Sequence, residues 1–478
     1  MDTVRYRRNN HQHQYEITSD KSLFSTKVDG LEKRIHKYYL VIALFFGVVL
    51  SILMPFFNEP DGVYHFVNSS NIVHLTTDIN IYGENSKWFG DQFVNQKPAY
   101  QNGDYFKKYF ETEVQRMPMS KLPRSTVYPK VLSYNFIGHL IPAIGIWAGY
   151  HIYPSIGMMI VCGRLVNMLV MTIGMFLIIK FVKRGKLLFM VVALSPVQMN
   201  LFSSLSYDAT SMLLVSIFIA AVINIVNRDK FTIFSLMRLC LLAAILYLGA
   251  KTNLCLVFLF IPLLVFAYPL KRIIKSIIVL TPPIARRIFM IITVGFLAVI
   301  AFYITHQRGG FLTLIYKLFI NFTYNFGGSD YSIFTSTFTK PLSGSNSKIP
   351  IYFSAVWFLL VGVAAFSETK FVKKSIISWT ALAIFILNIV ALFVIYSNVG
   401  GFTGDRGALM GQIGGIQGRY ITPLLPLLVL FAGNHRFVLG VTSRITVIRA
   451  AIVIAVLSNA TLLFDTLFTI FKLSLIHI

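Results

Sequence analysis

The stretch that decides the fold is Tyr38-Tyr-Leu-Val-Ile-Ala-Leu-Phe-Phe-Gly-Val-Val-Leu-Ser-Ile-Leu-Met-Pro-Phe-Phe57, which contains no charged side chain. Its length is close to the ~20 apolar residues that a helix needs to cross a bilayer. A polar stretch with eight lysines and arginines, residues 1–37, precedes it. Because a cleavable signal peptide would begin much closer to the N-terminus, we predict a permanent membrane-spanning helix here.

The rest of the sequence has the same character. Of the 478 residues, 55% are hydrophobic and 13% are charged, and the mean hydropathy is +0.67. A water-soluble fold cannot bury so much apolar surface, and the apolar residues fall in blocks of about the length of a span. The composition therefore predicts an all-α membrane protein that crosses the bilayer many times.

The net charge of +24 fits the same class of protein. Lysine and arginine lie mainly between the apolar blocks, which is typical of cytoplasmic loops, so we expect no nucleic-acid partner. Cys162, Cys240 and Cys255 lie inside apolar blocks and show no metal-binding spacing. We therefore expect no resident metal, while a divalent cation stays open as a cofactor.

The basic residues also predict the orientation. Residues 1–37 place the N-terminus in the cytoplasm, so the first span leads outward to a large extracytoplasmic loop, residues 58–155. Within this loop, residues 133–150 are apolar but contain His139, Pro142 and three glycines. We interpret them as a juxtamembrane helix, because this choice leaves eighteen basic residues in five short cytoplasmic loops.

About eleven spans are then expected, with the N-terminus inside and the C-terminus outside. After the first, they are expected at residues 156–180, 187–204, 209–226, 236–250, 253–270, 288–305, 351–367, 375–396, 420–434 and 449–470. The chain thus divides into three parts. These are a disordered cytoplasmic tail (1–37), a membrane domain (38–470) that includes the 58–155 loop, and a short C-terminal tail (471–478).

Three polar residues directly follow the first span. Glu59, Asp61 and His65 are candidates for function, because charge is costly next to an apolar environment. Asp61 and His65 are four residues apart, so a helix would place them on one face. A carboxylate there can act as a general base, and an imidazole can tune it or bind phosphate. The alternative is an ordinary solvated loop.

Further polar residues occur at the outer ends of later spans. Each one alone is also compatible with a snorkelling or solvated turn residue. The glycines near the last of them would let the backbone approach a ligand closely, and a guanidinium suits a phosphate. These residues are Arg164, Asp208, Lys251, Gln417, Arg419 and Tyr420.

Taken together, the residues predict an outer-face site for a phosphate-bearing lipid. Asp61, assisted by Glu59 and His65, would take the proton from an acceptor hydroxyl. The cations that would hold the lipid phosphate as leaving group are Arg164, Lys251 and Arg419. The sequence has no nucleotide-binding loop of the GxxxxGK[ST] type, so we expect no ATP-driven motor in this chain.

The order of these motifs resembles a family of bacterial multi-spanning membrane proteins of unknown function, related to the GT-C glycosyltransferases. In that family a Pro-Asp-Glu-x-x-His-Phe segment follows the first span, and Pro60-Asp61-Gly-Val-Tyr-His65-Phe66 is similar to it. Gly62 stands where the family has glutamate. Later stretches that resemble the family's motifs begin at Tyr128, Ser206, Gly249 and Gln417. The resemblance runs from about residue 40 to 435.

This resemblance implies a GT-C-like fold and an extracytoplasmic glycosyltransferase of the bacterial cytoplasmic membrane. The donor would be a polyprenyl-phosphate sugar, and the acceptor would be a cell-surface glycan, a teichoic acid or a lipid. Asp61 would correspond to the catalytic carboxylate, while Gly62 departs from the acidic motif and Glu59 is the acid that would substitute. The supporting residues would be Asp208, Gln417, Tyr420 and Tyr128.

Two other classes of function stay open. A transporter or flippase of lipid-linked glycans would also have many spans, although such proteins usually show repeated halves, and we find no internal repeat. A non-catalytic partner in glycan assembly is the third hypothesis, and Gly62 favours it.

Overall fold

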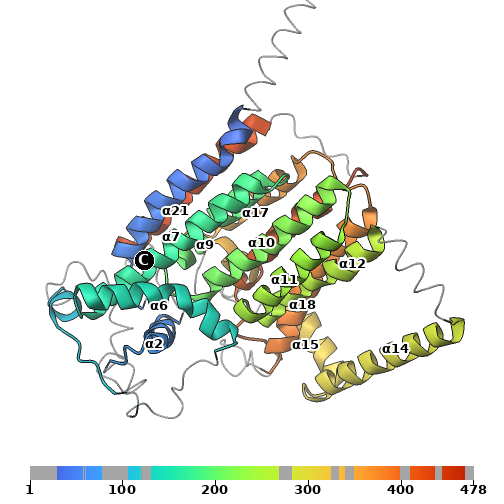
Figure 1. The fold of residues 1–478 in the computed structure, drawn as a ribbon, viewed down its shortest axis with the longest axis horizontal. Coiled ribbons are helices and arrows are strands. Elements are labelled where there is room, and N and C mark those ends of the chain that lie inside the picture. Colours follow the sequence, from blue (N-terminus) through green and yellow to red (C-terminus); the bar gives the residue numbers. More distant parts are fainter. Residues whose placement is uncertain are drawn as a thin grey trace, which may run out of the picture.

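The computed structural model describes residues 30–57, 59, 61–77, 106–118, 120, 131–268, 282–324, 333–339, 349–398, 410–436 and 444–468. This part of the chain is helical, and its extended segments meet in two isolated bridges, Thr77 with Arg116 and Val372 with Asn434. Figure 1 shows most helices gathered in one bundle, while α14 (Pro283–His306) projects away from it.

Several of the described helices suit a membrane. Five are long and apolar enough to cross one: Gly30–Leu53, α7 (Ile156–Phe181), α10 (Tyr207–Arg228), α18 (Ser375–Tyr396) and α21 (Arg444–Phe468). Shorter apolar helices are α11 (Ile233–Gly249), α15 (Phe311–Thr323), α17 (Tyr352–Phe366) and the combined segments Thr252–Ala267 and Thr422–Ala432. The prediction of an all-helical membrane protein with several spans is therefore confirmed.

The first helix begins at Gly30, earlier than the predicted Tyr38. Residues 30–37 are thus helical and do not belong to a disordered tail. The reason is tertiary, because Ile35 and Tyr39 are fully buried in the main core. Glu32 Oε1 also lies 2.8 Å from Arg444 Nη2 at the start of α21. Figure 1 shows these two helices side by side along one flank of the bundle.

Three predicted spans are broken into two pieces. Residues 187–204 form α8 (Lys186–Ala193) and α9 (Pro196–Phe202), and the proline lies at the first position of α9. A proline has no backbone N–H to donate, so it fits the first turn of a helix and tends to kink or break a helix further along. The other two begin as 3₁₀ helices, η6 (Thr252–Leu259) before α12 (Phe260–Ala267), and η9 (Thr422–Leu427) before α20 (Leu428–Ala432).

The helix α6 (Tyr134–Ile152) covers the stretch predicted to be juxtamembrane, and it is not among the five candidate spans. It packs closely on α7, because a Cβ at Gly145 would lie 2.4 Å from Cys162 O and a Cβ at Gly149 would lie 2.4 Å from Met158 O. Glycines four residues apart allow this approach of two backbones. In Figure 1, α6 runs across the end of the bundle where α2 (Gly62–Ile72) lies.

The opposite end of the bundle gathers the loops that carry many of the basic residues. Glu368 Oε2, which follows α17, accepts a hydrogen bond of 2.6 Å from Gly185 N and lies 3.2 Å from Arg444 Nη2. Lys373 Nζ lies 2.9 Å from Asp229 Oδ2 at the end of α10. The loops before α8, α11 and α18 and the first residue of α21 therefore lie together, far along the helices from α2.

Candidate active site

Four charged residues from distant parts of the chain meet at the α2 end of the bundle. Lys251 Nζ lies 2.7 Å from Asp208 Oδ1, and Arg419 Nε lies 2.9 Å from Asp208 Oδ2. Arg419 Nη2 lies 3.4 Å from Asp61 Oδ2. We call Asp61, Asp208, Lys251 and Arg419 the charged cluster. The sequence predicted all four as site residues, and the structure brings them together.

Each member is placed by the end of a helix. Asp208 lies in the first turn of α10, and its backbone N–H donates to Ser206 Oγ at the N-cap over 3.2 Å. Such first-turn positions suit an acid because of the helix dipole. Lys251 directly precedes η6, and Arg419 lies in the short 3₁₀ turn η8 (Gly418–Tyr420). Asp61 precedes α2 with φ of 55°, in the left-handed region that aspartate tolerates better than most residues.

The cluster is closed on one side and open on the other. The side chains of Arg419 and Asp208 are 2% and 8% exposed, whereas that of Asp61 is 58% exposed. The two carboxylates balance the charge of Lys251 and Arg419. The two cations therefore need no further counter-ion as long as Asp61 stays beside Arg419. A ligand that reaches this site from solvent therefore meets Asp61 first.

Tyrosine rings surround the cations. Lys251 Nζ lies 3.9 Å from the centre of the Tyr420 ring and 4.9 Å from that of Tyr207. Tyr396 from α18 stacks on Tyr420 with 6.1 Å between ring centres. Aromatic faces stabilise cations, and a flat ring with a polar hydroxyl can also pack against a sugar.

A histidine pair lies beside the cluster. His65 Nδ1 on α2 and His139 Nε2 on α6 are 2.8 Å apart, and His139 Nδ1 contacts the carbonyl oxygen of Asn135. Because a carbonyl only accepts, His139 Nδ1 carries the proton and donates it. A neutral His139 then accepts at Nε2, so His65 donates from Nδ1 and keeps the lone pair on Nε2.

Burial keeps this pair neutral. It lowers the pKa of His139 to about 4 and the pKa of His65 well below its usual value of 6.5. The nearby positive charges of Arg419 and Lys251 lower the pKa of His65 further. Both helices lie outside the five candidate spans. His65 therefore presents an uncharged imidazole whose tautomer is set by α6.

Glu59 and Arg164 form a second, separate ion pair. Both side chains are 0% exposed, and Arg164 donates from Nε to Glu59 Oε1 over 3.2 Å. Arg164 also donates from Nη1 to Met54 O over 2.6 Å and from Nη2 to Pro55 O over 3.0 Å. These carbonyls follow the end of the first helix, where no intrahelical donor is available.

This arrangement favours a structural role for Arg164, because the guanidinium holds the end of the first helix and has Glu59 as its counter-ion. It also gives Glu59 a partner other than a substrate. The expected roles of Arg164 in phosphate binding and of Glu59 in catalysis stay predictions.

The glycine at position 62 has a local structural reason. A Cβ there would lie 2.7 Å from Phe57 Cα and 3.2 Å from Glu59 Cγ. Real Cβ atoms do not approach backbone so closely, so the glutamate of the resembling motif does not fit without a shift of the 54–59 turn. The second acid is therefore sterically excluded in this conformation.

The glycine before Arg419 does not serve the role expected from the sequence. A Cβ at Gly418 would lie 2.3 Å from Thr337 N in α16 (Ile333–Thr339), so this glycine allows packing against α16 and not the approach of a ligand. Its neighbour Gln417 is partly buried. Among the described residues, Gln417 Oε1 is one of the buried side-chain acceptors with no hydrogen-bond partner. It is thus available to accept from a ligand hydroxyl.

Sequence reasoning missed His139, Tyr207 and Asn135 as members of the site. Tyr207 could have been predicted, because it directly precedes Asp208 in the turn that was already assigned to the site. Tyr128, predicted as a supporting residue, lies outside the described residues. In the described part of the chain, no group of three or more His, Cys, Asp or Glu residues lies close enough to hold a metal ion.

The fold and the site define a helical membrane protein with a buried ion cluster at one end of its bundle. Residues 44–428 match the family described as "Predicted membrane protein (DUF2142)", and the chain belongs to this family. No curated protein and no solved structure matches the chain.

Proposed function

We propose that this protein is a glycosyltransferase that moves a sugar from a polyprenyl-phosphate donor to a cell-surface glycan, a teichoic acid or a lipid. In this reaction the carboxylate of Asp61 accepts the proton of the acceptor hydroxyl. The acceptor oxygen forms a bond to the anomeric carbon, and the bond from that carbon to the phosphate oxygen breaks. The electron pair stays on the phosphate, which leaves as polyprenyl phosphate.

The observation that carries this proposal is the sharing of Arg419 between a buried acid, Asp208, and an exposed acid, Asp61. When Asp61 takes up a proton it loses its negative charge, just as the leaving phosphate gains one. Arg419 and Lys251 can then pair with the phosphate, and the net charge of the site stays constant. Preorganised cations in a water-poor site stabilise such a developing charge strongly.

Two further features support a sugar as the transferred group. Gln417 Oε1 is a buried acceptor that a sugar hydroxyl can satisfy. The rings of Tyr207, Tyr396 and Tyr420 line the same end of the bundle. The proposal gives Glu59 and Arg164 the task of holding the turn that carries Asp61, and it gives His65 the task of accepting a hydrogen bond beside it.

The proposal includes the topology. With about eleven spans and the N-terminus in the cytoplasm, the basic end of the bundle faces the cytoplasm and the charged cluster faces outward. The protein would then act at the outer face of a bacterial cytoplasmic membrane, where α6 lies along the surface. The relation to the GT-C glycosyltransferases rests on the order of the motifs.

The test compares Asp61→Asn with Asp229→Asn, an identical change at the other end of the bundle. Purified full-length protein in lipid nanodiscs is incubated with polyprenyl-phosphate sugars, and released polyprenyl phosphate is measured. We expect Asp61→Asn to lower the transfer rate by a factor of at least ~100, while Asp229→Asn keeps the unaltered rate. Full activity of Asp61→Asn would overturn the role of Asp61.

The same preparation separates the other two classes of function. Movement of an intact lipid-linked glycan across the bilayer without sugar release would identify a transporter. If a donor binds but is neither cleaved nor moved, the protein would be a non-catalytic partner in glycan assembly.

A further inference from the structure

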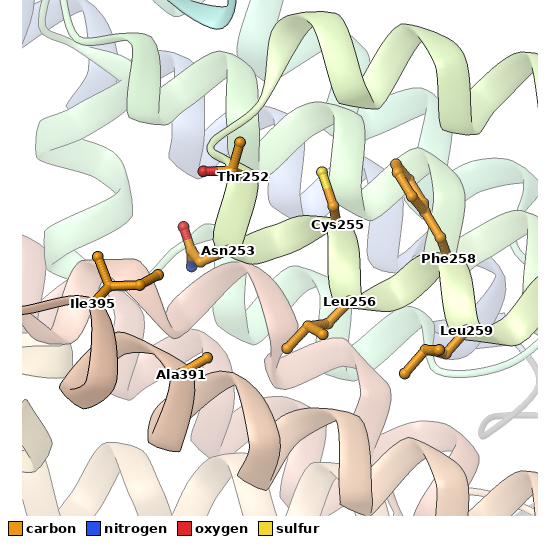
Figure 2. A pocket seen from close by; sticks show the side chains of 8 residues that line it. All are labelled: Thr252, Asn253, Cys255, Leu256, Phe258, Leu259, Ala391 and Ile395. Atoms are coloured by element: carbon orange, nitrogen blue, oxygen red, sulfur yellow. The ribbon is translucent and has the colours of Figure 1, made fainter. Parts of the chain in front are cut away.

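An apolar groove lies between η6 and α18, directly beside the charged cluster. It has a volume of about 460 Å³, which falls within the range of about 300–1,000 Å³ that is usual for small-molecule sites. Figure 2 shows that it runs from Thr252 and Asn253 at one end to Phe258 and Leu259 at the other. Ala391 and Ile395 of α18 form the facing wall.

The groove exists because this segment is a 3₁₀ helix. In such a helix, residues three apart stand above one another, so the side chains form columns. Two columns face the groove, and the third, which contains Leu254 and Val257, is buried in the core. The two groove columns are Thr252, Cys255 and Phe258, and Asn253, Leu256 and Leu259.

Residue 251 connects this groove to the charged cluster. Lys251 directly precedes η6, and its ammonium lies 2.7 Å from Asp208 Oδ1. At the same end, Asn388 Nδ2 donates to Asn253 O over 2.6 Å and fixes α18 against η6. The groove thus has a polar end next to the cations and an apolar end that leads away from them. A ligand with a phosphate at one end and a hydrocarbon chain behind it matches this order.

The far end of the groove reaches the outer surface of the bundle. Leu259 at this end is 45% exposed, and Ile395, which lies beside Asn253 at the polar end in Figure 2, is 50% exposed. On α18, which is a candidate span, exposed apolar side chains face lipid. A hydrocarbon chain can therefore enter from the bilayer sideways, with its phosphate arriving at Lys251 without crossing an apolar layer.

We infer that this groove binds the first isoprene units of the polyprenyl-phosphate donor, and that Lys251 and Arg419 hold the phosphate at its mouth. This inference rests on the proposed function for the identity of the lipid. It assigns the chain-length preference of the protein to η6 and α18. It also assigns a cause to the 3₁₀ segment, since an α-helix would place its side chains in different columns.

The test measures the binding of polyprenyl phosphates without any sugar. Ala391→Trp fills the groove, and Ile386→Trp, at a residue of α18 that is 50% exposed and does not line the groove, is the matched control. We expect Ala391→Trp to weaken binding of a long polyprenyl phosphate on the order of tenfold, because the chain loses its packing contacts. Binding of inorganic phosphate, which has no hydrocarbon chain, should change little, and Ile386→Trp should change neither.

A second measurement needs no substitution. Cys255 lines the groove, whereas Cys240 is an exposed thiol on α11. Long polyprenyl phosphate should slow alkylation of Cys255 severalfold by a lipid-soluble maleimide and leave Cys240 unaffected, and inorganic phosphate should protect neither thiol. Equal protection of Cys255 and Cys240 would overturn the inference, as would stronger protection by phosphatidic acid than by polyprenyl phosphate.

The two proposals fail separately. Groove-dependent binding of long polyprenyl phosphate without sugar transfer supports the groove and overturns the transferase function. Sugar transfer with an unchanged KM for a long-chain donor in Ala391→Trp supports the transferase function and overturns the groove. If Ala391→Trp does not fold, Ile395→Trp at the half-exposed rim replaces it.

Discussion

Arg419 Nε and Asp208 Oδ2 lie 2.9 Å apart, with 2% and 8% of their side chains exposed. One residue belongs to η8 and the other to the first turn of α10, so the pair joins two segments that are distant in the sequence. Removing one partner of such a pair leaves a charge in a place where water cannot solvate it. Stability and the proposed chemistry thus depend on the same contact.

The first prediction compares the two ends of α10. Asp208→Asn leaves Lys251 and Arg419 without their buried counter-ion, so we expect a loss of about 3–5 kcal/mol in the free energy of unfolding. Asp229→Asn breaks a pair in which Lys373 is 64% exposed, and should cost only about 0–1 kcal/mol. Thermal unfolding of both variants in detergent micelles checks this. Equal stability of the two variants would contradict it.

The second prediction concerns the pair of Glu59 and Arg164. Arg164→Met removes the donors to Met54 O and Pro55 O and leaves Glu59 buried alone, which should cost about 3–5 kcal/mol. The double variant Glu59→Met with Arg164→Met should regain part of that loss, because no unpaired charge remains. Sugar transfer then separates the roles. Retained activity in the folded double variant supports a structural role, and complete loss would favour a direct part of Arg164 or Glu59 in the reaction.

The third prediction concerns the glycine at the start of α2. Gly62→Ala places a Cβ 2.7 Å from Phe57 Cα, so the turn must shift at a cost of about 1–3 kcal/mol. Gly362→Ala on α17 meets nothing within 4 Å and should be neutral or slightly stabilising, by up to about 1 kcal/mol. Unfolding midpoints of the two alanine variants make the comparison. A stable Gly62→Ala protein would show that the turn can adapt to the missing acid.

The fourth prediction is a pH dependence of stability. Burial lowers the pKa of His139 to about 4 in the folded state, whereas an unfolded histidine has a pKa of about 6.5. Between these values the unfolded chain binds more protons than the folded one, so stability falls as the pH falls from 6.5 to 4. His65, whose pKa is also lowered, adds to the same trend. The double variant His65→Asn with His139→Asn should show a shallower pH dependence of its unfolding midpoint.

The helical, membrane-like character was predictable because the apolar blocks are long and separated by basic residues. Residues 375–396 were predicted as a span, and α18 has the same bounds. The 3₁₀ character of η6 was not predictable, since an apolar run has no polar residues to distinguish a period of 3.0 from one of 3.6. The helical start at Gly30 was missed because it depends on burial against other helices and on the ion pair with Arg444.

The candidate site was also predictable in part. Asp61, Asp208, Lys251 and Arg419 were predicted together, because each follows or precedes an apolar block at the end that the basic residues predict to face outward. The hydrogen bond between His65 and His139 joins residues 74 positions apart. No local pattern indicates such a partner, since it depends on the packing of α2 against α6.

The short distance in sequence between Glu59 and Asp61 has a mechanical consequence. Glu59 is fixed by Arg164, and the backbone N–H of His65 donates to Asp61 O over 3.0 Å. The backbone of Asp61 is thus fixed on both sides, and its exposed carboxylate can move only by rotation about the side-chain bonds. In the proposed transfer, an acid fixed in this way would accept a proton only from hydroxyls that reach it, so a bulky acceptor would need a protruding hydroxyl.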